Sequence, residues 1–419
     1  LNITPVDFAA LYARFDEVRD DISMSKESVL NDLLPLVQAA QLMSQKYDAV
    51  ITNPPYMGSR GMSAKLNAFV QKKYPDSKSD MFAVFIEKCR GYTRKDGFYA
   101  MITQPSFLFL TVFEALRKNL IATQTISSLL HMGRGIFGID FGSTAFSLRN
   151  THVRDYVGTY LKLHQRTFQY ISPEDIAKLF LNAKDNHEFK YDFSSYNPSD
   201  EVELNESTLC DEDEVEVTSA DKEQRLYYTI CQKLFLMIPG TPISYWLSDS
   251  FISAFQAEKL GDCAEVITGM TTGKNSEFLR LWYEVARNKT AIGYLNMSDI
   301  DFSICKWIPY SKGGDRRNFY GNGDYVVNWT RKDEFNRSKT TLQHLYLKPA
   351  VTWPFISSGK FSARYLPQGY LWDVAGSPCF FKNAKERTYA LGFLCTKIAD
   401  AALKIMNPTI NVQAIDLAK

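Results

Sequence analysis

The sequence lacks several features that define common classes of protein. Its seven cysteines form no C-x-x-C pair, which argues against a zinc ribbon or a disulfide framework and favours a reducing, cytoplasmic setting. No apolar run approaches the roughly 18–20 residues that span a bilayer, so no membrane partner is expected. The chain also lacks an excess of charge of either sign, because 48 Lys and Arg balance 47 Asp and Glu in 419 residues. A nucleic-acid-binding surface would therefore have to be confined to one face.

Signs of metal chemistry and of DNA cleavage are missing as well. The five histidines are scattered along the chain, and no D-x(n)-E-x-K pattern of a nuclease stands in a plausible place. We therefore predict no metal site and no cleavage activity within this stretch.

Short apolar runs alternate with helical patterns in the first half of the chain. This order predicts an α/β domain with a mostly parallel sheet and an antiparallel edge hairpin over residues 1–188. Residues 1–46 and 107–121 are expected to be helical, and a third helix should begin at Ser79 or Asp80. The expected strands are residues 47–52, 98–103 and 126–131, followed by two paired strands at 142–148 and 156–163.

The pattern changes after this domain. Residues 189–242 carry an acidic stretch and are expected to form a linker with a connecting helix at 221–238. Residues 243–419 contain short runs rich in Trp and Tyr, broken by Gly, Pro and Asn. They predict a second domain that is mixed α/β or β-rich.

The motif that carries chemistry is Asn53-Pro54-Pro55-Tyr56, directly after the apolar run 47–52. In an open α/β sheet, ligands bind beyond the carboxyl ends of the strands. There Asn53 offers an amide oxygen, the two prolines stiffen the loop and remove N–H donors, and Tyr56 offers a flat face. Two acceptors beside an aromatic ring suit a planar group with an exocyclic NH2. The alternative is an ordinary Pro-Pro turn.

The motif resembles the catalytic signature of N6-adenine DNA methyltransferases that use S-adenosylmethionine. The longer runs YDAVITNPPYMGSR, YPDSKSDMFAVFIE and GRGIFGIDFGSTAFSLRN resemble the PglX methyltransferases of BREX phage-defence systems. In the second half, ITGMTTGKN and SKGGDRRNFYGNGDYVVNW are similar to the target-recognition part of those enzymes and of type IIG restriction–modification proteins. The resemblance implies a Rossmann-like methyltransferase domain followed by a DNA target-recognition domain at 243–419.

The resemblance also implies roles for single residues. Asn53 and the Pro54 carbonyl would hold the adenine amino group, Pro55 would shape the loop, and Tyr56 would stack on a base flipped out of the duplex. Asp80 would lie near the methyl donor, or would simply cap a helix. A second aromatic would sandwich the base; Phe146 is the candidate, Phe137 and Phe141 are its rivals, and a core role competes for each.

The donor site itself is not expected in this chain. The family binds S-adenosylmethionine with a Gly-rich turn placed before N-P-P-Y, and residues 1–52 contain no such turn. Leu1 rather than Met stands first. We therefore expect an N-terminally incomplete domain whose S-adenosylmethionine site is incomplete, cut from a longer protein.

The expected partner is double-stranded DNA, together with other proteins of a defence system, and the expected state is a monomer. Basic residues interleaved with aromatics predict the DNA-facing surface, and its candidates are Lys312, Arg316, Arg317, Arg331 and Lys332. A solvated polar face is the alternative for each of them. Two other functions stay open: methylation of a protein glutamine or an RNA base, and a non-catalytic DNA-recognition subunit.

Overall fold

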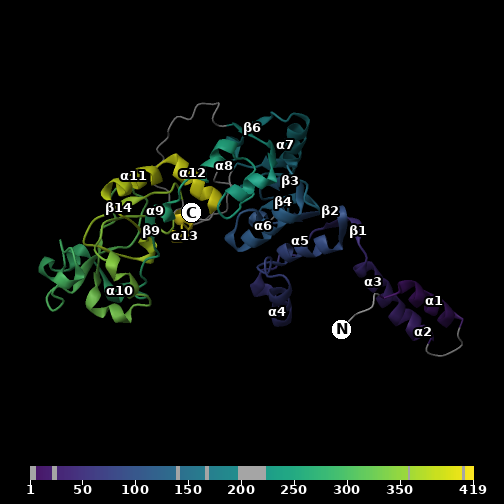
Figure 1. Ribbon diagram of the computed structural model, residues 1–419, viewed down its shortest axis with the longest axis horizontal. Coiled ribbons are helices and arrows are strands. Elements are labelled where there is room, and N and C mark those ends of the chain that lie inside the picture. Colours follow the sequence, from purple (N-terminus) through teal and green to yellow (C-terminus); the bar gives the residue numbers. More distant parts are fainter. Residues whose placement is uncertain are drawn as a thin grey trace. The chain divides into compact units, whose positions relative to one another are not determined.

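The computed structural model describes residues 6–20, 26–137, 142–165, 169–196, 223–356, 359–407 and 411–419 (Figure 1). The chain divides into two compact units. The first unit comprises Leu1–Phe107 and Ala115–Gln232, and the second comprises Leu108–Glu114 and Lys233–Lys419.

The chain begins with helices, as predicted. They are α1 (Phe8–Arg19), α2 (Lys26–Ser28) and α3 (Leu34–Ser44), with a π-helical segment at Val29–Leu33 between the last two. Asp7 caps α1 by accepting a hydrogen bond from the Ala10 amide. Pro35 lies in the first turn of α3. The backbone is helical from Lys26 through Ser44, and Pro35 lies in the turn that follows the π-helical segment in this run.

The first unit is built on a six-stranded sheet with the order β1-β2-β4-β3-β5-β8. Its strands are β1 (Tyr47–Thr52), β2 (Thr93–Thr103), β3 (Thr125–Met132), β4 (Ser143–Arg149), β5 (Val157–Leu163) and β8 (Tyr227–Cys231). β1 is parallel to β2 and β3 is parallel to β5, whereas β4 is antiparallel to β2 and β3, and β8 is antiparallel to β5. Four of these six strands thus run in one direction. The predicted mixed α/β fold with a mostly parallel sheet is confirmed.

Besides α1, α2 and α3, the described part of this unit contains α4 (Ala64–Lys73), α5 (Met81–Tyr92), α6 (Glu114–Thr123) and α7 (Pro173–Asp185). The α5 helix connects the parallel strands β1 and β2, and Asp80 caps it by accepting a hydrogen bond from the Phe82 amide. Phe82, Ile86 and Cys89 form the buried face of α5. The helix predicted to begin near Asp80 is therefore confirmed.

The predicted pairing of residues 142–148 with 156–163 is wrong. Both segments are strands, but β3 lies between β4 and β5. Phe146 on β4 faces Met101 of β2 on one side and Leu129 of β3 on the other. A strand whose apolar residues can pack against neighbours on both sides gains more buried surface inside a sheet than in an edge hairpin.

The predicted connecting helix at 221–238 is wrong for residues 223–231, and helical structure among its described residues is limited to the 3-10 helix Gln232–Met237. Glu223–Arg225 is strand β7, which pairs with β6 (Lys190–Asp192), and Tyr227–Cys231 is β8. The run Tyr227-Tyr228-Thr229-Ile230 consists of aromatic and β-branched residues, which favour a strand. In the structure this run forms β8, which pairs antiparallel with β5. Most of the acidic stretch, residues 197–222, lies outside the described residues.

The second unit contains two four-stranded sheets, β10-β12-β11-β15 and β14-β13-β16-β9. The strands are β9 (Ala264–Val266), β10 (Leu279–Leu281), β11 (Trp307–Ser311), β12 (Tyr325–Asn328), β13 (Ala350–Thr352), β14 (Arg364–Leu366), β15 (Leu371–Trp372) and β16 (Pro378–Phe381). Trp329, Tyr346 and Trp372 pack edge to face in its core. Such short strands with large aromatic residues match the predicted β-rich character.

Short helices complete the second unit. They are α8 (Asp249–Ala254), α9 (Leu260–Cys263), α10 (Asn275–Phe278), α11 (Ala384–Leu394), α12 (Lys397–Met406) and α13 (Ala414–Ala418). None of the helices within the described ranges is long and apolar enough to cross a membrane. The same ranges hold no group of three or more His, Cys, Asp or Glu that could bind a metal ion.

Candidate functional site

The Asn53–Tyr56 loop leaves the carboxyl end of β1, which is the first strand in the order of the six-stranded sheet. The Asn53 side chain is exposed, Pro54 is buried and Pro55 is exposed. Because both prolines lack an N–H and have a fixed φ, this stretch presents its carbonyl oxygens in a stiff arrangement. An accessible amide oxygen therefore stands at the strand end, the position at which open α/β sheets bind ligands.

The Tyr56 side chain is fixed by two contacts, one through its hydroxyl and one through its ring. Its hydroxyl lies 3.4 Å from the carbonyl oxygen of Ile102, to which it donates. Its ring meets the fully buried Phe82 edge to face, at 6.2 Å between centroids and 90° between planes. With 39% of the residue still exposed, the ring has a fixed orientation and an open surface on which a planar ligand can stack.

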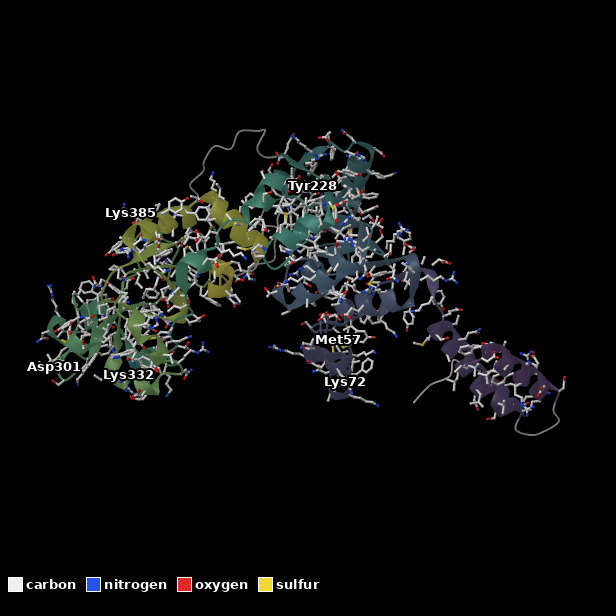
Figure 2. All side chains as sticks on the ribbon, in the orientation of Figure 1. Met57, Lys72, Tyr228, Asp301, Lys332 and Lys385 are labelled. Carbon is white, nitrogen blue, oxygen red and sulfur yellow. The ribbon has the colours of Figure 1, made fainter. Side chains whose placement is uncertain are left out.

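Asp80 ties the same loop to helix α5. Its Oδ1 accepts hydrogen bonds from the amides of Met57, at 3.0 Å, and Phe82, at 3.3 Å. Met81 returns a hydrogen bond from its amide to the carbonyl of Met57. Burial raises the pKa of the Asp80 carboxyl, and the hydrogen bonds from these amides oppose that rise. In this structure Asp80 fixes the loop that follows Tyr56; Met57 and Lys72 mark that loop and the next helix in Figure 2.

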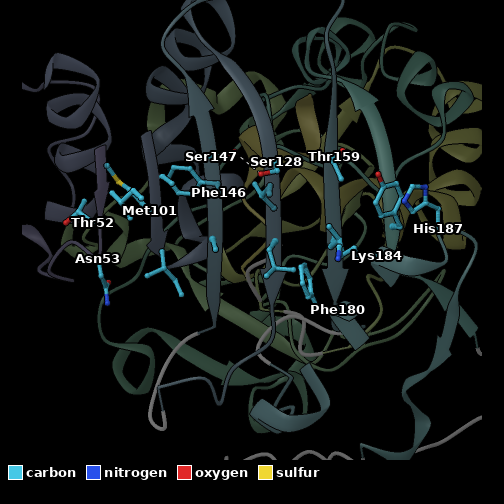
Figure 3. A pocket seen from close by; sticks show the side chains of 18 residues that line it. Thr52, Asn53, Met101, Ser128, Phe146, Ser147, Thr159, Phe180, Lys184 and His187 are labelled. Carbon is cyan, nitrogen blue, oxygen red and sulfur yellow. Dashed lines mark hydrogen bonds between the residues drawn. The ribbon is translucent and has the colours of Figure 1, made fainter. Parts of the chain in front are cut away.

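A cavity of about 760 Å³ opens along one face of the sheet, and Asn53 lies at its border (Figure 3). Apolar side chains such as Ile51, Ile102, Leu130 and Phe180 provide most of the lining. Its polar side chains come from several strands, from Lys184 on α7 and from His187 just after that helix. The volume is in the range of ligand sites, and Asn53 is the residue of the Asn53–Tyr56 loop that borders it.

The candidates for the second stacking aromatic differ in exposure. Phe146 is 4% exposed and packs against Phe107 at 5.2 Å between ring centroids, and it also lines the cavity that Asn53 borders (Figure 3). Phe137 is 52% exposed. Phe141 lies outside the described residues. By exposure, Phe137 is the better placed of the two described candidates.

The described residues do not fit a binding site for S-adenosylmethionine. Residues 1–57 of this sequence contain no glycine, and Asp80 is engaged by the amides of Met57 and Phe82. Later glycines allow close backbone packing: a Cβ on Gly133 would lie 2.4 Å from the Gln169 carbonyl oxygen, and one on Gly269 would lie 2.0 Å from that of Asp373. These glycines hold loops together and open no cradle for a donor.

The predicted DNA-contacting residues fall into two groups. Lys312 forms an ion pair at 2.9 Å with the buried Asp373. Arg331 pairs with Glu277 and Glu334, and Lys332 lies 3.8 Å from Asp333 (Figure 2). Arg316 and Arg317 are exposed and have no ion pair within the part of the chain that the structure describes. Only these two combine exposure with an uncompensated charge.

Sequence reasoning missed Arg364. This residue is completely buried, and its guanidinium donates to the carbonyl oxygens of Asp315 and Gly313, each at 3.2 Å. Arg364 thus lies beneath the loop that carries Arg316 and Arg317. No local pattern in the sequence distinguishes it from a surface arginine, because its burial depends on residues about fifty positions away.

Comparison with known proteins finds one matching family model and similar adenine-specific methyltransferases. The model of the family "Eco57I restriction-modification methylase" matches residues 11–137. The chain is 32% identical over 397 residues to the adenine-specific methyltransferase PglX of Lacticaseibacillus casei (strain Zhang), which covers 91% of this chain and 30% of that protein. It is 30% identical over 436 residues to the adenine-specific methyltransferase BrxX of Escherichia coli O9:H4 (strain HS), covering 100% and 32%.

Among solved structures, a nuclease-deletion mutant of the Type ISP restriction-modification enzyme LlaGI in complex with a DNA substrate mimic aligns with 96% of this chain. The alignment covers 36% of that chain at 11% identity and a TM-score of 0.47. The chain spans about a third of the length of its curated relatives. Over almost its whole length it is similar to PglX-type adenine-specific methyltransferases, and the resemblance predicted from its motifs is thereby confirmed.

Proposed function

We propose that the protein to which this chain belongs is a site-specific DNA adenine-N6 methyltransferase of a BREX-like phage-defence system. In this proposal residues 1–188 are the C-terminal portion of the methyltransferase domain, 189–242 connect, and 243–419 recognise the DNA target. The observation that carries it is the exposed Asn53 amide at the end of β1 beside the fixed, open ring of Tyr56.

The chemistry of the loop suits an adenine. The lone pair of an aromatic amine is conjugated into its ring, which makes the nitrogen a poor nucleophile. The Asn53 side-chain oxygen and the Pro54 carbonyl each accept one amino hydrogen, which favours a pyramidal nitrogen and later assists loss of a proton. Tyr56 holds the base by stacking and so fixes the direction of attack, which is a contribution of orientation.

The methyl group comes from S-adenosylmethionine, which is implied by the family and supplies an activated methyl on a sulfonium. Because the described residues do not fit that donor, we assign its binding to parts of the natural protein outside this sequence. The 419-residue chain is accordingly expected to bind the donor weakly or not at all, which isothermal titration can test. A micromolar site on this chain would contradict the assignment.

An adenine within a duplex can reach the Asn53 loop only when it is flipped out of the stack. Contacts of Arg316 and Arg317 with phosphates would offset part of the cost of flipping. Double-stranded DNA is therefore the proposed partner, and no membrane partner is proposed.

The test uses the full-length natural protein with DNA and labelled S-adenosylmethionine, followed by digestion to nucleosides. Label in N6-methyladenine is expected. Replacement of Asn53 by Ala should reduce its formation by at least ~100-fold, the order expected when a reacting group loses its positioning. The exposed Asn182 of α7 is a matched control, and its Ala variant should keep wild-type activity.

Two results would contradict the proposal. Label in protein or RNA, with none in DNA, would favour the alternative substrates. An active Asn53→Ala variant would remove Asn53 from the reaction.

A further inference from the structure

Residues 312–323 form a loop of the second unit between β11 and β12, and its backbone is held in unusual conformations. Five of its residues have positive φ: Gly313 (87°), Gly314 (91°), Phe319 (69°), Gly321 (128°) and Asn322 (59°). Glycine adopts such angles readily, but for a bulky residue such as Phe319 they are strained. Strain of this kind persists only where the surroundings enforce it, and it gathers at functional sites.

Buried groups enforce this conformation from below. The fully buried Arg364 donates from Nη1 to the Asp315 carbonyl and from Nη2 to the Gly313 carbonyl, each at 3.2 Å. Asn322, also buried, donates to the same Asp315 carbonyl at 2.8 Å. The backbone of Phe319 bonds to that of Ala363, at 2.9 Å, and to that of Tyr365, at 2.8 Å. The loop is therefore attached to the strand β14 at several points.

The rigid loop presents two kinds of side chain to solvent. Phe319 is 56% exposed and Tyr320 is 68% exposed. Arg316 and Arg317 are exposed beside them, and the carboxylates nearest in sequence are those of Asp315 and Asp324. Two large aromatic rings kept in water on a strained, anchored loop have no role in the core of this unit.

The charge below the loop adds to that of the two exposed arginines. Arg364 carries a full positive charge at neutral pH, although burial lowers its pKa to about 10 and the nearby Arg317 acts in the same direction. Its described partners are carbonyl oxygens, not carboxylates. A buried charge without an ionic partner is poorly screened, so it makes the potential above the loop more favourable for anions.

We propose that residues 312–323 form a DNA-reading loop. In this assignment Phe319 and Tyr320 contact bases, Arg316 and Arg317 contact phosphates, and Arg364 is the positioning residue that holds the tip in its strained conformation. The assignment rests on the proposed function, because it names the part of the second unit that would read the DNA sequence. A duplex combines an anionic backbone with flat, apolar base surfaces, which are the two features that this tip complements.

The experiment uses the full-length protein and genomic DNA that lacks its modification. The positions of N6-methyladenine are mapped by sequencing, and binding to a non-specific duplex is measured between about 50 and 200 mM salt. There are two test variants, each with two substitutions. The first combines Phe319→Ala with Tyr320→Ala, and the second combines Arg316→Ala with Arg317→Ala. The controls are Tyr389→Ala and Lys385→Ala on α11, where both side chains are exposed.

The double variant Phe319→Ala with Tyr320→Ala should prefer the correct base about tenfold less at one or more positions of the methylated sequence. Its non-specific affinity should change little. The arginine pair should lower non-specific affinity and reduce the slope of log affinity against log salt by about 2, one unit for each lost phosphate contact. Both control variants should behave like the wild type.

Arg364→Lys separates positioning from stability. Lysine keeps the positive charge but lacks the planar fork that reaches two carbonyls. We expect this variant to relax the methylated sequence as the aromatic double variant does and to keep a salt slope close to that of the wild type, with a loss of thermal stability from the missing hydrogen bonds to buried carbonyls. Loss of stability with an unchanged methylated sequence would show that Arg364 is only structural and would contradict its assignment.

The two double variants decide the main claim. If both methylate the same adenines at the wild-type rate, with the wild-type salt slope, the loop does not read DNA and the proposal is wrong, although the proposed function stands. A wild-type protein that methylates no adenine in DNA would instead overturn the proposed function, and this assignment with it.

Discussion

The two candidate sites, the Asn53 loop in the first unit and the loop at 312–323 in the second, differ in how the surrounding residues support them. In the first unit, Asn53 follows an edge strand in which Ile51 is 81% exposed, and the sheet face beside it is open and apolar. In the second unit, the loop at 312–323 lies over completely buried Arg364 and near Asp373, which is 1% exposed. The described residues of the first unit leave this edge and the face beside it exposed. The second has its supporting groups in place, so its loop geometry should survive without further chain.

The largest effect on stability is expected at Asp373. Its carboxylate accepts from the Tyr310 hydroxyl at 3.0 Å and from Lys312 at 2.9 Å, and it caps the Ala375 amide. Asp373→Ala would leave a buried hydroxyl and a half-buried cation without their partner. Breaking a buried pair in this way costs ~3–5 kcal/mol, and chemical denaturation followed by hydrogen exchange in the second unit can measure the loss.

The matched control is Asp333→Ala, which removes an exposed carboxylate 3.8 Å from Lys332. Exposed ion pairs contribute little, so its cost should stay below ~1 kcal/mol. Equal costs for the two variants would mean that the second unit is not supported by its buried ions, and the contrast between the units would disappear.

Much of the first unit could be predicted from its sequence, because its signals are local. The apolar run that ends at Asn53 is β1, and Asp80 caps the helix that its position predicts. Strand pairing is not local, so the insertion of β3 between β4 and β5 could not be read from two similar apolar runs. The exposure of Asn53 and Tyr56 fits the role predicted for them.

The second unit was less predictable for the same reason. Its basic residues are visible in the sequence, but the carboxylates that neutralise Lys312 and Arg331 come partly from positions over fifty residues away. The support of the 312–323 loop by Arg364 depends on a contact between distant segments too. The interleaving of basic and aromatic residues, together with the family resemblance, favoured five candidate DNA contacts, and the structure leaves two of them with uncompensated charge.

Substitution of Ile51 tests whether the open edge of the first unit is covered in the full-length protein. If the rest of the natural polypeptide packs against β1, Ile51→Lys should destabilise that protein by ~1–3 kcal/mol, the range for losing a buried aliphatic side chain. The control is Ile398→Lys on α12, where the isoleucine is 61% exposed; its effect should stay within ~0.5 kcal/mol. Equal tolerance of both changes in thermal unfolding would show that the edge stays open.

The smallest predicted effect is a loss of stability of the first unit at acid pH. His131 on β3 is buried, and burial lowers its pKa from 6.5 to about 3, with Lys162 acting in the same direction. Between these two values the unfolded chain binds a proton that the folded sheet does not, so stability falls as pH falls below 6.5. The loss approaches ~1.4 kcal/mol per pH unit. Hydrogen exchange at pH 7 and pH 5.5 should show extra opening of the first unit at the lower pH, and His131→Leu should remove most of this difference. If the variant and the wild type show the same dependence on pH, other groups cause the acid sensitivity and His131 takes no part in distinguishing the two units.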